Sequence, residues 1–184
     1  MILALYGVLS VALMVFAPTI DVILDSGATV SLRSLYQDSK LGLIFLRHLG
    51  CPFCREQVVE LRNYPEANLA FVVMASPEAT RAFKEKLRSP HPFICDPTKA
   101  LYRSFGLGSA SLGQIFNTHT LMRGTALALK GVGGGRMVGD PFALAGSFVI
   151  DIDGKVIWEY QAKDAADNPE IHCVLDRLLV GNKT

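Results

Sequence analysis

A chain of 184 residues, half of them hydrophobic, is long enough for one domain with a sizeable core and at most a short appendage. Its 18 basic and 17 acidic side chains nearly balance and form no basic block, so the electrostatic footprint of a nucleic-acid-binding protein is missing. Four cysteines in a chain of this length do not make a disulfide scaffold. We therefore expect no nucleic-acid partner, and cysteine usage alone leaves the compartment open.

The N-terminal segment 2–17 carries no charged side chain and is rich in apolar residues. A bilayer-spanning helix needs about 20 apolar residues, and a run of about 10–14 is more typical of a buried helix or a signal-peptide core, so this segment falls between the two. The rest of the pattern needs no further fully apolar element. We therefore predict that residues 1–17 form a hydrophobic leader, anchor or signal, in front of a domain spanning 18–184.

This leader predicts a protein that is membrane-associated or exported through residues 2–17. No Lys or Arg precedes the apolar run, which argues against a secretory signal. The alternative is a strand or helix packed on the domain of a cytoplasmic protein.

Strand and helix signals alternate along the rest of the chain. Short continuous apolar runs are typical of strands buried on both faces, and Ser or Asp followed by Pro marks the start of a helix. This alternation predicts an α/β fold with a central mixed β-sheet flanked by helices. The expected elements are a hairpin 20–24 and 29–32, strands 41–47, 69–74 and 91–95, helices 52–63 and 77–87, a helix starting at 96–97, a closing hairpin 147–151 and 155–160, and a last helix 169–179.

The segment 106–140 is the least regular part of the chain and holds nine glycines. We predict a long insertion, helical over part of 115–129, with a mobile loop at 131–135. The glycine cluster lacks the Gly-Lys-Ser/Thr ending of a phosphate-binding loop and follows no strand, so it does not predict nucleotide binding. We expect no cofactor and no metal site.

The motif Cys51-Pro52-Phe53-Cys54 lies between a predicted buried strand and a predicted helix. Pro52 suits the first helical position, which places Cys51 at the helix N-terminus. Unpaired backbone N–H groups and the helix dipole there favour a thiolate, so the pKa of Cys51 should fall. Cys54 lies one turn further on, better shielded but close enough to resolve an adduct or to form a disulfide without backbone movement.

We therefore predict redox chemistry at Cys51 and Cys54, with Cys51 as the attacking sulfur. Arg47 is the candidate third catalytic residue, because Arg47 and Arg55 are the nearest cations that can stabilise a thiolate or a peroxide oxygen. The alternatives are a structural disulfide, half of a zinc site, two inert buried thiols and, for the arginines, solvated surface positions. Cys173 is predicted to be a packing residue of the last helix.

Three stretches together resemble the peroxiredoxin-like branch of the alkyl hydroperoxide reductase/thiol-specific antioxidant (AhpC/TSA) family. They are the run Phe-Leu-Arg-His-Leu-Gly-Cys-Pro-Phe-Cys-Arg-Glu at 45–56, the segment 96–107, and 146–155 followed by Asp-Ala-Ala-Asp-Asn-Pro at 164–169. The resemblance covers roughly residues 18 to 180. It implies a thioredoxin-like fold and a thiol-based antioxidant or oxidoreductase role, and it names no substrate.

The chain departs from this family at the site itself. The peroxiredoxin loop Pro-x-x-x-Thr-x-x-Cys falls on Arg47, Cys51 and Cys54, so only the last cysteine matches and the resemblance assigns the peroxiredoxin cysteine to Cys54. The second signature of the family, an arginine, would fall near Ala145, and the cis-proline of thioredoxins would fall near Gly146. Both are missing.

The sequence thus predicts a thiol-disulfide oxidoreductase or antioxidant enzyme that uses the Cys51/Cys54 pair. A thiol peroxidase that reduces hydroperoxides is the alternative within enzymes. A membrane-tethered binding domain with a structural or metal-holding dithiol is the alternative of another class. We expect a thiol electron donor of the thioredoxin or glutathione type, and the sequence defines neither the donor nor the oligomeric state.

Overall fold

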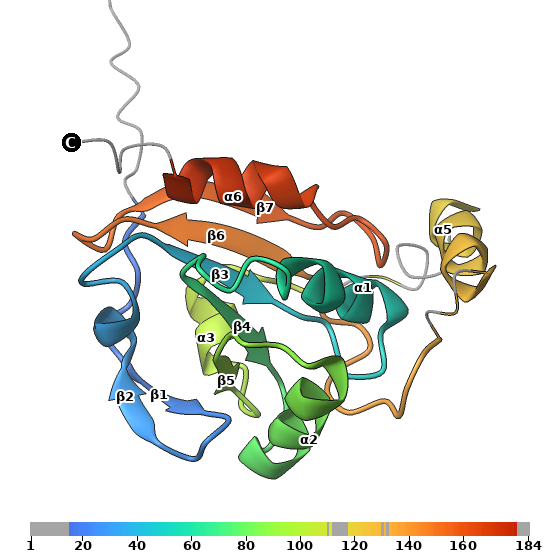
Figure 1. Cartoon of the computed structure of the whole chain (residues 1–184), viewed down its shortest axis with the longest axis horizontal. Helices are drawn as coiled ribbons and strands as arrows, with labels where there is room; N and C mark the ends of the chain where they lie inside the picture. Colours follow the sequence, from blue (N-terminus) through green and yellow to red (C-terminus); the bar gives the residue numbers. More distant parts are fainter. Residues whose placement is uncertain (1–14, 110, 112–117, 130, 132, 180–184) are drawn as a thin grey trace, which may run out of the picture.

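The computed structural model describes residues 15–109, 111, 118–129, 131 and 133–179. Figure 1 shows the elements in chain order. They are β1 (Asp21–Leu24), β2 (Thr29–Ser31), the 3-10 helix η1 (Leu32–Leu35), β3 (Leu41–Phe45), α1 (Pro52–Leu61), β4 (Leu69–Val73), α2 (Pro77–Leu87), β5 (Phe93–Cys95), α3 (Ala100–Ser104), α5 (Thr118–Leu129), β6 (Gly146–Ile150), β7 (Val156–Gln161) and α6 (Ile171–Leu179).

One mixed sheet organises these elements in the order β2-β1-β5-β4-β3-β6-β7. The pairs β3–β4 and β4–β5 are parallel, and the other neighbours are antiparallel. Every residue of β3, β4 and β6 is buried, as expected for strands covered on both faces. The predicted α/β class with a central mixed sheet is confirmed, and β3, whose end leads into the Cys-x-x-Cys motif, lies inside the sheet.

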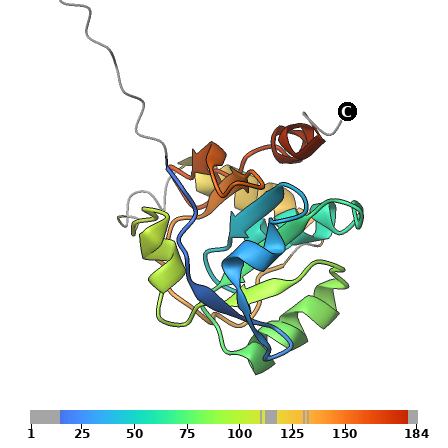
Figure 2. The same ribbon diagram turned by 90° about the vertical axis from the view of Figure 1, so that its left-hand side faces the viewer.

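Helices cover both faces of the sheet, because successive strand residues point to opposite sides. On one face Ile44 and Phe71 pack with residues of α1, α2 and α6. On the other face Phe45 and Val72 pack with Tyr102 of α3 and with η1. Figure 2 shows α3 on the opposite side of the sheet from α1 and α2. This three-layer arrangement is the thioredoxin-like architecture that the resemblance implies.

The helix expected from Asp96 onward begins later than predicted, at Ala100. Asp96 still caps it, because its carboxylate accepts the N–H groups of Ala100 at 2.9 Å and Leu101 at 2.8 Å. The capping carboxylate thus lies one turn before the helix and not on the residue next to it. The sequence alone does not distinguish these two capping arrangements.

The described end of the hydrophobic segment is attached to the β6–β7 turn. The N–H of Ala17 donates to Gly154 O at 2.8 Å, and the N–H of Val156 donates to Val15 O at 2.8 Å. Residues 2–14 of the predicted leader lie outside the described residues, as do 115–117 of the predicted helix. In the part of the chain that the structure describes, none of the helices combines the length and apolarity that crossing a membrane requires.

The glycine-rich end of the insertion packs against the loop between β3 and α1. The N–H of Leu49 donates to Val138 O at 3.0 Å, and the N–H of Gly135 donates to Gly50 O at 3.1 Å. A Cβ added at Gly50 would lie only 2.5 Å from Gly135 O, so the two backbones approach this closely because residue 50 is glycine. The described insertion thus reaches the site that the motif defines.

Candidate active site

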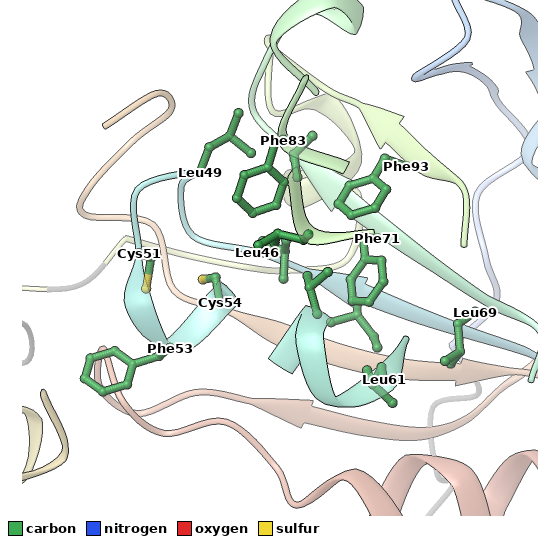
Figure 3. Close-up of a cluster of buried hydrophobic side chains, with 14 of the residues drawn as sticks. Leu46, Leu49, Cys51, Phe53, Cys54, Leu61, Leu69, Phe71, Phe83 and Phe93 are labelled. Atoms are coloured by element: carbon green, nitrogen blue, oxygen red, sulfur yellow. The ribbon is translucent and has the colours of Figure 1, made fainter. Parts of the chain in front are cut away.

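The turn from β3 into α1 places Cys51 where the sequence predicted it. Cys51 is the N-cap of α1 with an extended backbone, and Pro52 is the first helical residue. Figure 3 shows both cysteines at the start of this helix, beside the packed leucine and phenylalanine side chains of the core. The first turn of α1 thus brings the two sulfurs together at one end of the core.

Residue exposure alone does not distinguish the two cysteines, although Cys54 was predicted to be the better shielded one. Each cysteine is only 1% exposed. The structure separates them by contact, because Cys51 lines a pocket of about 900 Å³ and Cys54 is not among its lining residues. A molecule in this pocket therefore lies against Cys51 and not against Cys54.

Arg47 is a buried cation at this site rather than a solvated surface residue, and only 4% of it is exposed. Its Nη1 lies 3.9 Å from Cys51 Sγ. Its Nε donates to Ala143 O at 2.9 Å, and its Nη2 donates to Pro141 O at 2.6 Å. The three predicted site residues Arg47, Cys51 and Cys54 are thus together.

The surroundings of Cys51 favour its thiolate. A hydrogen bond from the Cys54 thiol lowers the pKa of Cys51 most, burial opposes this, and the charge of Arg47 and the N–H groups of Cys54 and Phe53 lower it further, from 9.0 to about 6. With a pKa near 6, Cys51 is mainly ionised at neutral pH, the state that a thiol needs to act as a nucleophile.

The same contacts act on Cys54 in the opposite direction. Donation of its proton to Cys51, burial and the charge of Cys51 raise the pKa of Cys54 well above 9.0. The backbone N–H of Arg47, which points at Cys54 Sγ from 3.3 Å, opposes these effects without outweighing them. Cys54 therefore stays a thiol and can act as the second, resolving sulfur.

The pocket beside Cys51 has a mainly apolar wall. Helix α5 forms one side of it, and a Cβ added at Gly124 would lie 3.9 Å from Phe53 Cζ. Polar groups are contributed chiefly by Arg47, His48 and threonines. The lining residues are Arg47, His48, Cys51, Pro52, Phe53, Thr118, Thr120, Leu121, Gly124, Thr125, Ala128, Met137, Pro141, Phe142 and Ala165.

His48 is a pocket residue that the sequence reasoning did not single out. Its Nδ1 is buried and has no hydrogen-bond partner among the described residues. Burial lowers the pKa of His48 most, Arg47 lowers it further and Asp140 opposes both, giving about 4. His48 is therefore neutral at physiological pH, and its position three residues before Cys51 was the only sequence signal for it.

The remaining cysteines lie elsewhere in the fold. Cys95 is buried on β5, where its thiol donates to Thr80 Oγ1 at 3.4 Å, and Cys173 is half-buried on α6. Within the described ranges, no group of three or more His, Cys, Asp or Glu side chains is placed to hold a metal ion.

Two buried free cysteines at the N-terminus of a helix, on a mixed sheet covered by helices on both faces, are the arrangement of a thioredoxin-fold thiol enzyme. The family description "AhpC/TSA antioxidant enzyme" matches residues 55–164, more than half of the chain. The chain therefore belongs to the AhpC/TSA antioxidant enzyme family and is a thiol-based oxidoreductase. This match begins one residue after Cys54, so it does not test the roles of the two cysteines.

Individual relatives agree with this assignment. The chain is 25% identical to human (Homo sapiens) peroxiredoxin-like 2C in an alignment of length 175 that covers 86% of this chain and 76% of that protein. Among solved structures it is similar to peroxidoxin BcpB from Mycobacterium tuberculosis, with a TM-score of 0.60 and 17% identity over 90% of this chain and 94% of that one. It is also similar to a peroxiredoxin 6 mutant from Arenicola marina, with a TM-score of 0.64 and 14% identity over 89% and 70% of the two chains. These structures show the fold.

Proposed function

We propose that the protein reduces hydroperoxides, with Cys51 as the nucleophile and Cys54 as the resolving cysteine. The observation that carries this is the position of Cys51 Sγ, 3.9 Å from the buried Arg47 guanidinium on the wall of the apolar pocket. Dithiol exchange needs only the two cysteines, whereas peroxide reduction also needs a cation for the developing oxygen charge, and Arg47 provides one.

The reaction follows from these positions. The Cys51 thiolate attacks the terminal oxygen of the hydroperoxide, the O–O bond breaks, an S–O bond forms, and the leaving oxygen takes up a proton and departs as an alcohol or water. The Cys54 thiol then attacks the sulfenic acid of Cys51, which gives the disulfide and one water. A donor dithiol, or two thiols of the thioredoxin or glutathione type, reduces the disulfide and is itself oxidised.

The apolar lining of the pocket favours hydroperoxides that carry a bulky apolar group over hydrogen peroxide. Burial of such a group contributes roughly 25 cal/mol for each Å² of apolar surface removed from water, and hydrogen peroxide has no such surface. We expect a higher kcat/KM for cumene hydroperoxide than for hydrogen peroxide with the same electron donor.

The decisive experiment compares the wild type with Cys51→Ser and Cys54→Ser. Cys51→Ser should abolish peroxide consumption. Cys54→Ser should consume one equivalent, and dimedone should label the sulfenic acid on Cys51 in mass spectrometry. Dimedone label on Cys54 of the Cys51→Ser variant, together with retained turnover, would reverse the assignment of the two cysteines.

Disulfide exchange is the second candidate function, favoured by the hydrogen bond between the two thiols on the first turn of α1. In that reaction Cys51 attacks a substrate disulfide and Cys54 resolves the mixed disulfide. Reduction of insulin disulfides, measured beside peroxide consumption on the same protein, compares the two. A fast insulin reaction with no peroxide turnover would make exchange the main activity.

A further inference from the structure

Arg47 depends on a distant segment for its position. Two of its three guanidinium nitrogens donate to backbone carbonyls, Nη2 to Pro141 O at 2.6 Å and Nε to Ala143 O at 2.9 Å. The third nitrogen, Nη1, is directed at Cys51 Sγ. The guanidinium is planar and its donors point in fixed directions. The two carbonyls therefore determine how closely the charge approaches the sulfur.

The two carbonyls are in turn held by Asp140. Its Oδ1 accepts the N–H of Phe142 at 2.8 Å, and its backbone oxygen accepts the N–H of Ala143 at 3.1 Å. Its Oδ2 forms an ion pair with Lys99 Nζ. We call residues 141–143, which include the two carbonyls that hold Arg47, the carbonyl segment. Asp140 thus links the carbonyl segment to the start of α3, on the main body of the domain.

Lys99 itself has a backbone conformation that non-glycine residues seldom adopt. Its φ is 58°, in the left-handed region, at the N-cap of α3. On the other side of Asp140, Gly139 forms an isolated β-bridge with His48, the residue after Arg47. The carbonyl segment is therefore attached at two separate places, and one of them retains local strain.

We propose that Asp140, paired with Lys99, is a positioning residue of the enzyme: it fixes the Pro141 and Ala143 carbonyls that hold the Arg47 guanidinium against Cys51 Sγ. The inference rests on the proposed function in taking Cys51 as the reacting thiolate. It also accounts for the missing arginine near Ala145, because Arg47 supplies the cation from the motif itself and the segment before β6 only orients it.

Charge and position predict opposite effects of removing Asp140. The charged and titratable groups near Cys51 include Cys54, Arg47 and His48, and Arg55 on the same turn of α1, with Asp140 and Lys99 behind Arg47. Loss of the Asp140 carboxylate removes a negative charge, which by itself favours the Cys51 thiolate. Release of Arg47 from its position disfavours the thiolate. The direction of the shift therefore separates the two explanations.

The test compares Asp140→Asn and Asp140→Ala, which remove the same charge. Asparagine retains an oxygen for the Phe142 N–H, whereas alanine does not. We expect alanine to raise the midpoint of the Cys51 thiolate titration, followed by absorbance at 240 nm, by about one pH unit, which lowers the iodoacetamide rate at pH 5 about tenfold. Asparagine should shift the midpoint less.

A matched control is available in the turn between β6 and β7. There Asp153 Oδ1 accepts the N–H of Lys155 at 2.9 Å, the same arrangement two residues apart, on an exposed turn that contributes no residue to the pocket. Asp153→Ala should leave the Cys51 midpoint unchanged. A shift equal to that of Asp140→Ala would show a general effect of such substitutions and overturn the proposal.

The double variant Lys99→Met with Asp140→Asn removes one charge of each sign. If position matters, its Cys51 midpoint stays above that of the wild type, and if charge alone matters, it returns to the wild-type value and the proposal fails. The double variant also serves if Asp140→Ala does not fold. The titration requires no peroxidase activity, so a raised midpoint in a protein that never consumes peroxide would support the positioning role and refute the proposed function instead.

Discussion

At the scale of single residues, two equally buried cysteines differ in pKa because of their hydrogen bonds. The Cys54 thiol donates to Cys51, which lowers the pKa of Cys51 and raises that of Cys54, and the N–H groups of Cys54 and Phe53 lower the pKa of Cys51 further. The sequence could predict the direction of this difference, because a helix N-terminus is recognisable from the Pro that follows the first cysteine. It could not predict the equal burial, which depends on how α5 and the carbonyl segment lie over the loop.

Alkylation of the reduced protein across pH should show a midpoint near 6 for Cys51, the value its surroundings give. Cys54→Ala removes the hydrogen bond that lowers this pKa most, so its midpoint should rise by about one pH unit or more. Iodoacetamide labelling followed by peptide mass spectrometry measures both sites. Faster labelling of Cys54 than of Cys51 at acidic pH would contradict the assignment.

Replacing Arg47 by Met should slow peroxide reduction by about 10²-fold, because it removes the charge that lowers the pKa of Cys51 and that we propose stabilises the leaving oxygen. Arg47→Lys keeps the charge but loses the planar donors to Pro141 and Ala143, so we expect an intermediate rate. Single-turnover oxidation of Cys51, followed by stopped-flow fluorescence of the one tryptophan, gives the rates.

The control for this series is Arg55→Met, since Arg55 was the other candidate cation and is only half-buried on α1. It should oxidise at a rate close to that of the wild type. Equal losses in the Arg47 and Arg55 variants would mean that the general positive potential, rather than the Arg47 contact, supports the reaction.

At the scale of elements, the alternation of buried strands and capped helices was sufficient to predict most of the fold. Continuous apolar runs identified β3 and β4, and Ser76-Pro77 identified the start of α2, where Ser76 Oγ accepts the N–H of Ala79. The insertion was recognised but could not be placed. Its contacts with residues 48–50 use backbone groups, and backbone hydrogen bonds between distant segments leave no side-chain pattern to read.

Helix α5 forms a pocket wall that can be altered without touching the cysteines. Gly124→Leu should fill the space between α5 and Phe53, whose ring is 3.9 Å from the position of the added Cβ. Leucine is also a better helix former than glycine, because glycine costs about 0.8–1.0 kcal/mol relative to alanine in a helix interior and leucine ranks close to alanine. The free energy of unfolding should therefore not fall. We expect kcat/KM for cumene hydroperoxide to drop about tenfold or more, with hydrogen peroxide little affected.

Ala126→Leu is the matched control, a small-to-leucine change at an exposed position of the same helix that does not line the pocket. It should leave both substrates unchanged. If Gly124→Leu slows both peroxides equally, the pocket does not select the substrate and the loss reflects a displaced Cys51 loop.

At the scale of the whole molecule, the lowered pKa of Cys51 links stability to pH. Well below pH 6 this sulfur is protonated in both the folded and the unfolded chain, so its ionisation contributes nothing to the free energy of unfolding. Between pH 6, near the pKa of Cys51 in the folded chain, and pH 9.0, its pKa in the unfolded chain, only the folded chain holds this sulfur as a thiolate. The free energy of unfolding of the reduced protein therefore rises by up to roughly 1.4 kcal/mol for each pH unit in this range. The stabilisation is therefore present above pH 9 and is lost as pH falls through 6.

Urea unfolding of reduced wild type and Cys51→Ser between pH 5.5 and 8.5 measures this linkage. The difference in unfolding free energy between the two proteins should grow with pH. A difference that is constant across this range would show that the pKa of Cys51 is the same in the folded and unfolded chains.

The last three residues of the predicted leader, 15–17, are hydrogen-bonded to the β6–β7 turn, so two truncations test where the leader ends. Removing residues 1–14 should leave the melting temperature unchanged if the leader is separable, as the sequence predicts. Removing 1–17 also deletes the two backbone hydrogen bonds to the β6–β7 turn and the burial of Ala17, each hydrogen bond contributing about 0.5–1.5 kcal/mol. We expect this second chain to melt a few degrees lower while keeping a cooperative transition. Fractionation of cells that express the full chain and the chain starting at Val15 tests the proposed membrane association, which requires that only the full chain sediment with membranes.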